Sequence, residues 1–170
     1  MTVLPMRIFG DPILREPCRD VERFDASLEK LGADLLDAMT HYSGVGVAAN
    51  QIGISLRAFV YDDDGTPRWL VNAEIADLDG EESVDEGCLS VPGLYFPTAR
   101  AARLQLKGVD LEGTSVEFVA EGFLARVMQH ETDHLKGLLY LDRLDDVTRR
   151  EAMRQIREQD MGAREVQRRT

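Results

Sequence analysis

Two of the chain's three histidines lie four residues apart in QHETDH at 129–134, and a glutamate follows the first of them directly. If this stretch is helical, each residue turns by about 100°, so His130, Glu131 and His134 share one side. Two imidazoles one turn apart can bind the same metal ion, and a carboxylate beside them can handle protons for a water on that ion. Phe123 and Val127 fall on the same side and predict an apolar wall. The spacing therefore predicts a catalytic metal site on a helix.

A third ligand is expected, because a catalytic zinc-type site usually takes three protein ligands and leaves one position for water. No histidine follows His134 in the sequence. The thiolate of Cys88, in the glycine-flanked stretch EGCLS at 86–90, is the favoured candidate, since backbone can approach a site closely there. Other interpretations stay open: Glu151 or Cys18 as the ligand, or Cys88 as an ordinary buried thiol.

The composition indicates one soluble globular domain. The chain has 170 residues, of which 44% are hydrophobic and 30% charged. A net charge of −11 argues against DNA binding by the body of the protein. No apolar stretch reaches membrane-spanning length, and MTVLPMRIFG lacks the pattern of a signal peptide. Two cysteines without an export signal favour reduced thiols or ligands over a disulfide, so we expect a cytoplasmic protein with no membrane partner.

The pattern of the chain predicts the elements that position these residues. They are a proline-rich arm up to about 24, a helix at 26–42 capped by Asp25, strands at 56–62 and 67–75, an acidic turn-rich segment at 81–93, strands at 100–110 and 115–122, a helix at 123–137 and a last helix from Asp146 to about 160. The DDDG between the first two strands predicts a hairpin turn rather than a calcium loop, because its acids lack alternate spacing. We expect an α+β fold with antiparallel strands packed around a central metal-binding helix, an N-terminal helix and a C-terminal helix.

Three motifs together resemble the bacterial peptide deformylases, which remove the N-formyl group from new polypeptides. These motifs are GVGVAANQ at 44–51, EGCLS at 86–90 and QHETDHLKG at 129–137. Their order and spacing also fit, and the resemblance covers roughly residues 5–145. Each motif would supply a different part of one site.

The resemblance implies a role for each site residue. It implies Cys88, His130 and His134 as metal ligands, Glu131 as the group that moves protons, and the Gln51 side-chain amide and the Leu89 backbone N–H as donors to the oxyanion. It implies a divalent metal, ferrous iron in the cell, with Zn²⁺, Ni²⁺ or Co²⁺ also suited to one thiolate and two imidazoles. The substrates would be N-formylmethionyl peptides.

Substrate binding can be expected from the same motifs. A peptide can add as a strand beside exposed backbone around Gly46, and Val45 and Val127 can line a pocket for the methionine side chain. Some members of the family carry an arginine where this chain has Tyr95, which predicts different contacts beyond methionine. Arg100 could pair with Glu86 and steady the cysteine loop.

Two other functions remain possible at this stage. A zinc endopeptidase would use the same helix, but this sequence lacks the downstream ligand expected for such an enzyme. A closed structural metal site would need a fourth protein ligand, such as Cys18.

The C-terminal segment differs from the rest in charge. We expect a catalytic domain at 1–147 and a basic helical tail at 148–170, which holds seven arginines and four acidic residues. Such asymmetry often marks an interaction tail, and the resemblance suggests the ribosome as its partner. The alternative is a helix that lies against its own acidic body, with Met153 and Ile156 packed inward.

Overall fold

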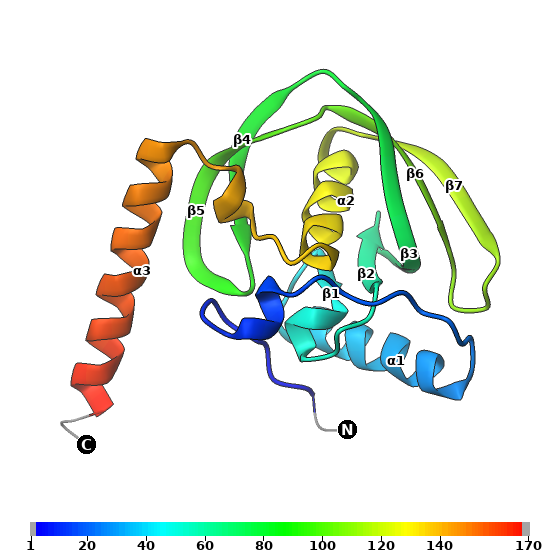
Figure 1. Cartoon of the computed structure of the whole chain (residues 1–170), viewed down its shortest axis with the longest axis horizontal. Helices are drawn as coiled ribbons and strands as arrows, with labels where there is room; N and C mark the ends of the chain where they lie inside the picture. The colour runs from blue at the N-terminus through cyan, green and yellow to red at the C-terminus, as the bar shows by residue number, and fades with distance from the viewer. Residues whose placement is uncertain (1–2, 168–170) are drawn as a thin grey trace.

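The structure, a computed structural model, describes residues 3–167, with side chains described as far as Asp160. Its helices are α1 (Ala26–His41), α2 (Gly122–Leu135) and α3 (Asp146–Gln167), with short 3-10 turns η1 (Pro12–Arg15), η2 (Ala49–Ile52) and η3 (Tyr140–Arg143). Helix α2 lies inside a curved arrangement of strands, and α1 and α3 lie outside it (Figure 1). None of the described helices is long and apolar enough to span a membrane.

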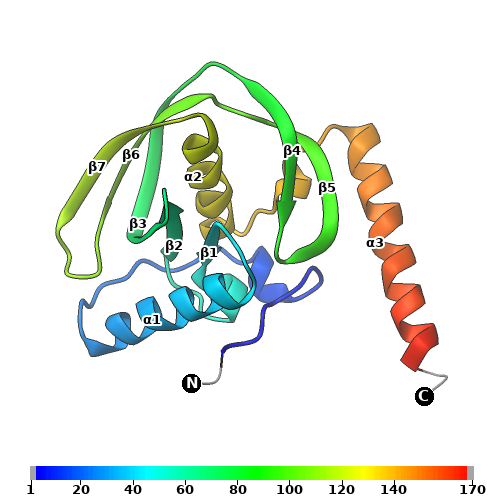
Figure 2. The ribbon, with the colours of Figure 1, turned by 180° about the vertical axis from the view of Figure 1, so that it is seen from behind.

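The strands form two antiparallel sheets. The larger has the order β1-β2-β3-β6-β7 and consists of β1 (Gly46–Ala48), β2 (Ala58–Asp63), β3 (Thr66–Asp79), β6 (Arg103–Val109) and β7 (Ser115–Glu121). The smaller pairs β4 (Glu82–Cys88) with β5 (Val91–Arg100). Helix α2 stands between the two sheets, as both the front and the rear views show (Figures 1 and 2). This arrangement confirms the predicted α+β fold with a central helix.

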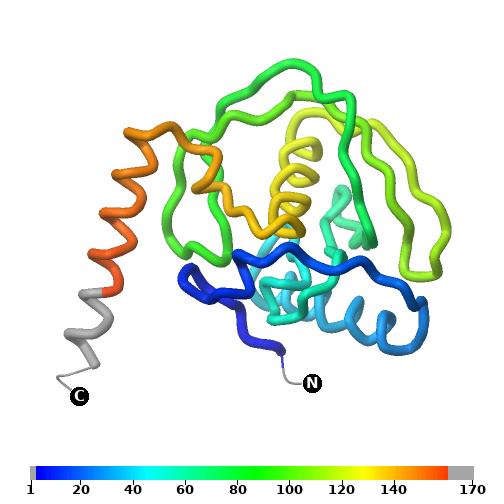
Figure 3. The backbone as a smooth tube through the Cα atoms, viewed as in Figure 1, coloured from blue at the N-terminus to red at the C-terminus, as the bar shows by residue number. Residues whose placement is uncertain are grey.

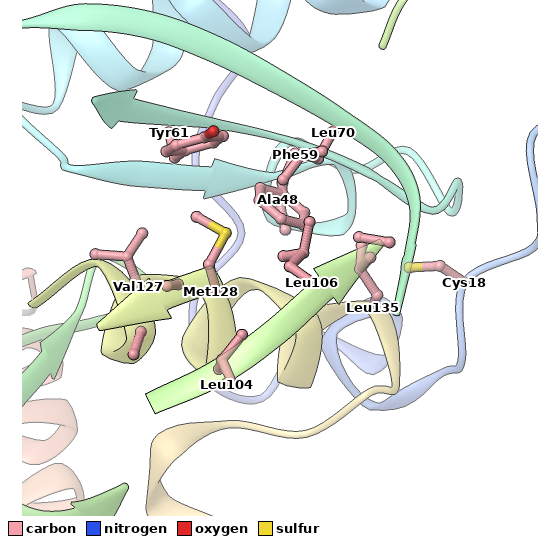
Figure 4. Packing of buried hydrophobic residues seen from close by; sticks show 13 residues of the cluster. Cys18, Ala48, Phe59, Tyr61, Leu70, Leu104, Leu106, Val127, Met128 and Leu135 are labelled. Carbon is pink, nitrogen blue, oxygen red and sulfur yellow. The ribbon is translucent and has the colours of Figure 1, made fainter. Parts of the chain in front are cut away.

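Helix α2 can be enclosed because most of its side chains are apolar or form hydrogen bonds or ion pairs. Val127, Met128 and Leu135 of this helix pack against residues of the larger sheet (Figure 4). The helix ends before Gly137, which has a φ of +73°. A Cβ at this position would lie 2.7 Å from the Arg15 carbonyl, so glycine also permits the N-terminal arm to cross the helix end.

Helix α1 follows its prediction closely. Asp25 caps it by accepting a hydrogen bond of 3.0 Å from the N–H of Ser27. Its buried face includes Leu28, Leu31 and Leu35 and covers a second core cluster formed with β1 and β2. The hairpin turn at DDDG is also confirmed: Asp64 and Gly65 have positive φ and join β2 to β3.

The prediction for residues 81–93 was wrong. This segment is not mainly turns, because Glu82–Cys88 and Val91–Arg100 pair as a hairpin, with a register shift between Gly87 and Cys88. Side chains along β5 alternate between buried and exposed from Leu94 to Arg100, which is strand periodicity. Glu82 and Asp85 of β4 are exposed whereas Glu86 is partly buried, and Pro92, Gly93 and Pro97 obscure the pattern in the sequence.

The first half of helix α3 packs against the hairpin. Ala152 and Ile156 are buried in a core cluster with β5 and η3, and Met153 is partly buried there. The helix continues beyond the predicted end near 160 and reaches Gln167. It lies along the outer side of β5 (Figures 1 and 2).

Candidate functional site

Three donor atoms converge between α2 and the end of β4. The Cys88 Sγ lies 3.3 Å from the His134 Nε2, which lies 3.2 Å from the His130 Nε2. All three atoms fall within 4.8 Å of one another. Donors that surround one tetrahedral ion at normal ligand distances are about 3.3–3.6 Å apart. The cluster therefore has the spacing and the chemistry of a site for a transition-metal ion.

The two histidines are tied to other segments in different ways. The Nδ1 of His130 lies 2.6 Å from a carboxylate oxygen of Glu86, so its Nε2 is left to face the metal site. The backbone carbonyl of His134 accepts a hydrogen bond of 2.8 Å from the Asn50 side chain, which ties this turn of α2 to η2. The His130 ring is thus held by a group outside the ligand set, whereas the buried Nδ1 of His134 has no hydrogen-bond partner among the described residues.

A buried ionic network surrounds Glu86. Arg100, whose side chain is 3% exposed, donates to both oxygens of Glu86 at 2.7 and 3.0 Å and to Asp133 at 2.6 Å. Asp133 also accepts two hydrogen bonds from Arg143 in η3. The pairing of Arg100 with Glu86 that the sequence suggested is therefore present, and it extends to two further residues.

Charge and burial set the protonation of these groups. Burial alone would raise the pKa of Glu86, but hydrogen bonds from Arg100 and His130 lower it to about 2. Burial also opposes a charge on His130, yet the neighbouring Cys88 and Glu86 raise its pKa well above the usual value. A proton on His130 is thus stabilised by the same negative charge that would stabilise a divalent cation.

His134 has the opposite tendency. Burial, and then the charge of His130, lower its pKa well below the usual value. The ring is therefore neutral at physiological pH, which is the form that binds a metal.

Glu131 lies beside the donor cluster on the same helix. It is 3% exposed, and burial raises the pKa of its carboxyl to about 7. A Cβ placed on Gly46 would lie 2.5 Å from its Oε1, so β1 can pass this carboxylate only because residue 46 is glycine. Its other oxygen is buried without a hydrogen-bond partner among the described residues, which leaves an acceptor for a water or substrate.

Gln51 faces the cluster from η2. Its Oε1 accepts a hydrogen bond of 2.9 Å from the N–H of Ala48, which fixes the orientation of the amide. Its Nε2 donates to the Ser90 hydroxyl at 3.1 Å and lies 3.6 Å from the Cys88 sulfur. Leu89 lies between these residues in the turn that joins β4 to β5. The donor end of the amide therefore points toward the metal-binding group.

A cavity of about 770 Å³ opens over this group. Its lining includes all but one of the residues that the sequence predicted for the site: Val45, Gly46, Gln51, Cys88, Leu89, Val127, His130 and Glu131. The exception is His134, which is buried behind the cavity wall. The structure thus brings all the predicted site residues together.

Sequence reasoning missed several lining residues. Arg126 places its guanidinium carbon 5.5 Å from the ring centre of Phe123, and both line the cavity. Arg126 stands one helical turn before His130, so the same periodicity could have found it. Met6 and Ile8 come from the N-terminal arm, and no local pattern marks them.

The rival ligands lie elsewhere. Cys18 is 8% exposed within the core cluster beside α2 and the larger sheet, and burial raises the pKa of its thiol. Glu151 lies on α3 and pairs with Arg154 at 2.6 Å. Neither belongs to the metal-capable group found among the described residues.

Comparisons with known proteins agree with this geometry. The family model described as polypeptide deformylase matches residues 3–150. The peptide deformylase of Acidothermus cellulolyticus is 48% identical over 166 residues, which cover 98% of this chain and 92% of that protein. The peptide deformylase of Dictyoglomus thermophilum is 46% identical over 143 residues and covers 84% of this chain and 94% of that protein. The crystal structure of a peptide deformylase from Legionella pneumophila has a TM-score of 0.88 at 40% identity and covers 96% of this chain and 99% of that one.

The geometry predicts which thiol holds the metal. Cys88→Ala should lose most of the bound metal, since one of three donors disappears, whereas Cys18→Ser should keep it. Metal content per chain, measured on both variants after identical purification, checks this expectation. A Cys18→Ser protein that loses its metal while remaining folded would contradict the assignment of the ligands.

Proposed function

The chain belongs to the polypeptide deformylase family and is a metal-dependent hydrolase that removes the N-formyl group from newly made polypeptides, and we propose how its own residues divide this work. The observation that carries the proposal is the convergence of three donor atoms under a cavity that Glu131 and Gln51 also face. Membership of this family excludes the zinc endopeptidase and the closed structural metal site that the sequence had left open.

The metal ligands are Cys88, His130 and His134. Support comes from their mutual distances and from the absence of a fourth protein ligand in this group among the described residues. Bound there, a divalent ion would act as a Lewis acid toward the formyl group and the attacking water.

Glu131 moves the protons of the reaction. It takes a proton from the attacking water and later delivers one to the departing amine of methionine. Its place next to both histidines on α2, and its unpartnered buried oxygen, support this role. Gly46 keeps the space beside the carboxylate clear of side-chain atoms.

The oxyanion that forms on the formyl oxygen accepts hydrogen bonds from the Gln51 amide and the Leu89 backbone N–H. Donors of this kind act on charge that develops only in the transition state, so they lower the barrier directly. Ala48 and Ser90 hold the Gln51 amide on both sides, which means that little reorganisation is needed during the reaction.

The substrate adds to the edge of the larger sheet. Strand β1 is the end strand in the order of that sheet, so one of its edges is open to a peptide. Main-chain pairing around Val45 and Gly46 would bind peptides of any sequence. The methionine side chain enters the apolar part of the cavity, next to Val45, Phe123 and Val127.

Ferrous iron is the metal that we assign to the enzyme in the cell, and the cytoplasm is its location. A single thiolate with two imidazoles suits iron as well as zinc, nickel or cobalt, so the donor set is compatible with iron but does not select it. Formylated new chains are the substrates, which supports a location where proteins are made.

The tail at 148–170 is the second unit of the chain, and we assign it ribosome binding. Several of its arginines are already neutralised: Arg149 pairs with Asp142, and Arg154 pairs with Glu151 and Glu158. Arg150 and Arg157 form no ion pair with the residues that the structure describes. They are seven residues apart, close to two helical turns of 3.6 residues, so they share a face of α3 that can meet RNA phosphates.

The first prediction concerns the proton carrier. Glu131→Gln should keep the metal but lose at least about a hundredfold of the rate, because general acid–base catalysis contributes on that scale. Formate release from a formyl-Met peptide, with metal content measured in parallel, checks it. A metal-loaded variant with near-normal turnover would exclude the proposed role of Glu131.

The second prediction concerns the metal. If iron is native, activity should decay faster in air than under nitrogen, because the Fe²⁺ ion and the Cys88 thiolate are both oxidisable. Nickel-loaded enzyme should last longer in air. Equal half-lives in air and nitrogen, with iron verified in the site, would count against iron as the cause of any instability.

The third prediction concerns the tail. Arg150→Gln with Arg157→Gln should weaken ribosome co-sedimentation and reduce its salt dependence, while turnover of a free formyl-Met peptide stays normal. Substitution is preferable to removal of residues 148–170, because removal would uncover the core around Ala152 and Ile156. Arg103→Gln with Lys107→Gln on β6 changes the charge equally and serves as the control. Equal binding by the two double variants would mean that the tail is only structural.

A further inference from the structure

Four side-chain atoms are buried without a hydrogen-bond partner among the described residues: Asn50 Oδ1, Arg126 Nη1, Glu131 Oε2 and His134 Nδ1. Arg126 and Glu131 line the cavity, so a molecule in the cavity can supply their partner. Asn50 and His134 do not line it, and their exposed fractions are 0% and 1%. Because a buried polar atom without a partner is costly, these two atoms need a partner from another source.

The unpartnered atom of His134 is a donor whenever this residue binds a metal. Its Nε2 faces the metal-capable group, at 3.3 Å from the Cys88 Sγ and 3.2 Å from the His130 Nε2. A histidine that binds a metal through Nε2 is neutral and carries its one ring proton on Nδ1. The buried side of the ring therefore presents an N–H that no described residue accepts.

The unpartnered atom of Asn50 is an acceptor, and the other end of the amide fixes its identity. The amide nitrogen Nδ2 donates to the His134 carbonyl at 2.8 Å. A carbonyl oxygen only accepts, so the nitrogen must be the atom that faces it, and the oxygen Oδ1 is the atom left without a partner. Asn50 belongs to η2, which lies beside the end of α2 (Figure 3). An unpartnered donor and an unpartnered acceptor thus belong to two residues that are in contact.

One water molecule would satisfy both atoms. They are not hydrogen-bonded to each other, although their residues are in contact. A water can accept from the Nδ1–H and donate to the Oδ1, and two protein partners are enough to hold a buried water. A cation would be repelled by the N–H and an anion by the amide oxygen. A molecule that both donates and accepts therefore suits the site better than either ion.

We propose that Asn50 is a positioning residue for His134, which it holds in two ways: the carbonyl directly, and the Nδ1–H of the ring through one buried water. The inference rests on the proposed function, because it concerns a ligand of the proposed metal site. His130 has the carboxylate of Glu86 behind its ring, whereas the ring of His134 has no described side chain in that place. Partners of this kind fix the tautomer and orientation of a ligand ring, and their loss typically costs about 10–100-fold in metal affinity.

The place of Asn50 in the chain connects this support to the oxyanion donor. Asn50 directly precedes Gln51 in η2, and the Gln51 amide is held by Ala48 and Ser90. A shift of η2 relative to α2 would therefore displace the donor from the metal site as well as loosen the ligand. Such a displacement acts on the transition state more than on substrate binding, so substitution of Asn50 should lower kcat more than it raises KM.

The test uses the zinc-loaded enzyme, because zinc has no redox chemistry of its own. Asn50→Leu keeps the branched shape of the side chain but has no polar atom, and Asn50→Asp keeps an acceptor for the water. Transfer of zinc to a chelating dye should be about 10–100 times faster for Asn50→Leu than for the wild type, and Asn50→Asp should lie between them. A crystal structure of the wild-type enzyme should show a water within about 3.2 Å of both Asn50 Oδ1 and His134 Nδ1.

Asn72→Leu is the matched control. Asn72 lies on β3 and does not line the cavity, and its amide also joins two segments: it accepts from the Val21 N–H and donates to the Val21 carbonyl, both at 2.9 Å. Loss of these bonds should lower the melting temperature while zinc transfer and kcat stay at the wild-type values. Equally fast zinc transfer from Asn72→Leu and Asn50→Leu would mean that Asn50 has only a structural role, and would overturn the inference.

Three further results would also overturn it. They are zinc transfer from folded Asn50→Leu at the wild-type rate, equal transfer from the two Asn50 variants, and a wild-type crystal structure in which the Nδ1–H of His134 meets a protein atom instead of a water. The crystal structure decides even if Asn50→Leu does not fold. Formate release by the wild type, measured in parallel, upholds the proposed function in each of these cases. No formate release, with the water in place, would overturn the proposed function alone.

Discussion

The carboxylate of Glu86 is shared between Arg100 and His130, and most of the site depends on this sharing. Through it the metal-binding face of α2 is joined to β4 and β5, and Asp133 and Arg143 extend the connection to η3. Buried charges of this kind add little net stability, because their desolvation offsets their attraction. Loss of one partner, however, leaves another buried and unpaired, which costs about 3–5 kcal/mol. The network therefore acts mainly by allowing one arrangement of the helix and the hairpin.

That arrangement explains how a site assembled from distant segments can keep one defined geometry. The proposed ligands come from β4 and α2 and the proposed oxyanion donors from η2 and the β4–β5 turn, and each pair is tied by at least one hydrogen bond between segments. The core cluster that α2 forms with the larger sheet restricts the helix further. Groups fixed in this way can stabilise developing charge with little movement.

The sequence was informative where the chemistry is local. The ligands on α2 follow from a spacing of four residues, and Cys88 from a shortage of other donors. The hairpin at 82–100 was missed, because its acids and prolines obscured an alternation that only pairing between strands makes meaningful. The bonds of Asp133 to Arg100 and of the arm to Gln51 and Ser90 join segments far apart in the chain. Their partners are chosen by tertiary packing, and no single local pattern could identify them.

The crossing of the arm over the end of α2 has a consequence for synthesis of the protein itself. Cys18 donates its N–H to the carbonyl of Leu135 at 2.9 Å, and Gly137 lies against Arg15. The N-terminal arm, which is synthesised first, therefore cannot dock until the end of α2, which is synthesised late, has been made. Contacts of such long sequence separation form late, since the loop between them must close first. A chain whose translation has not passed α2 lacks His130 and His134, so the proposed metal site cannot form before that point.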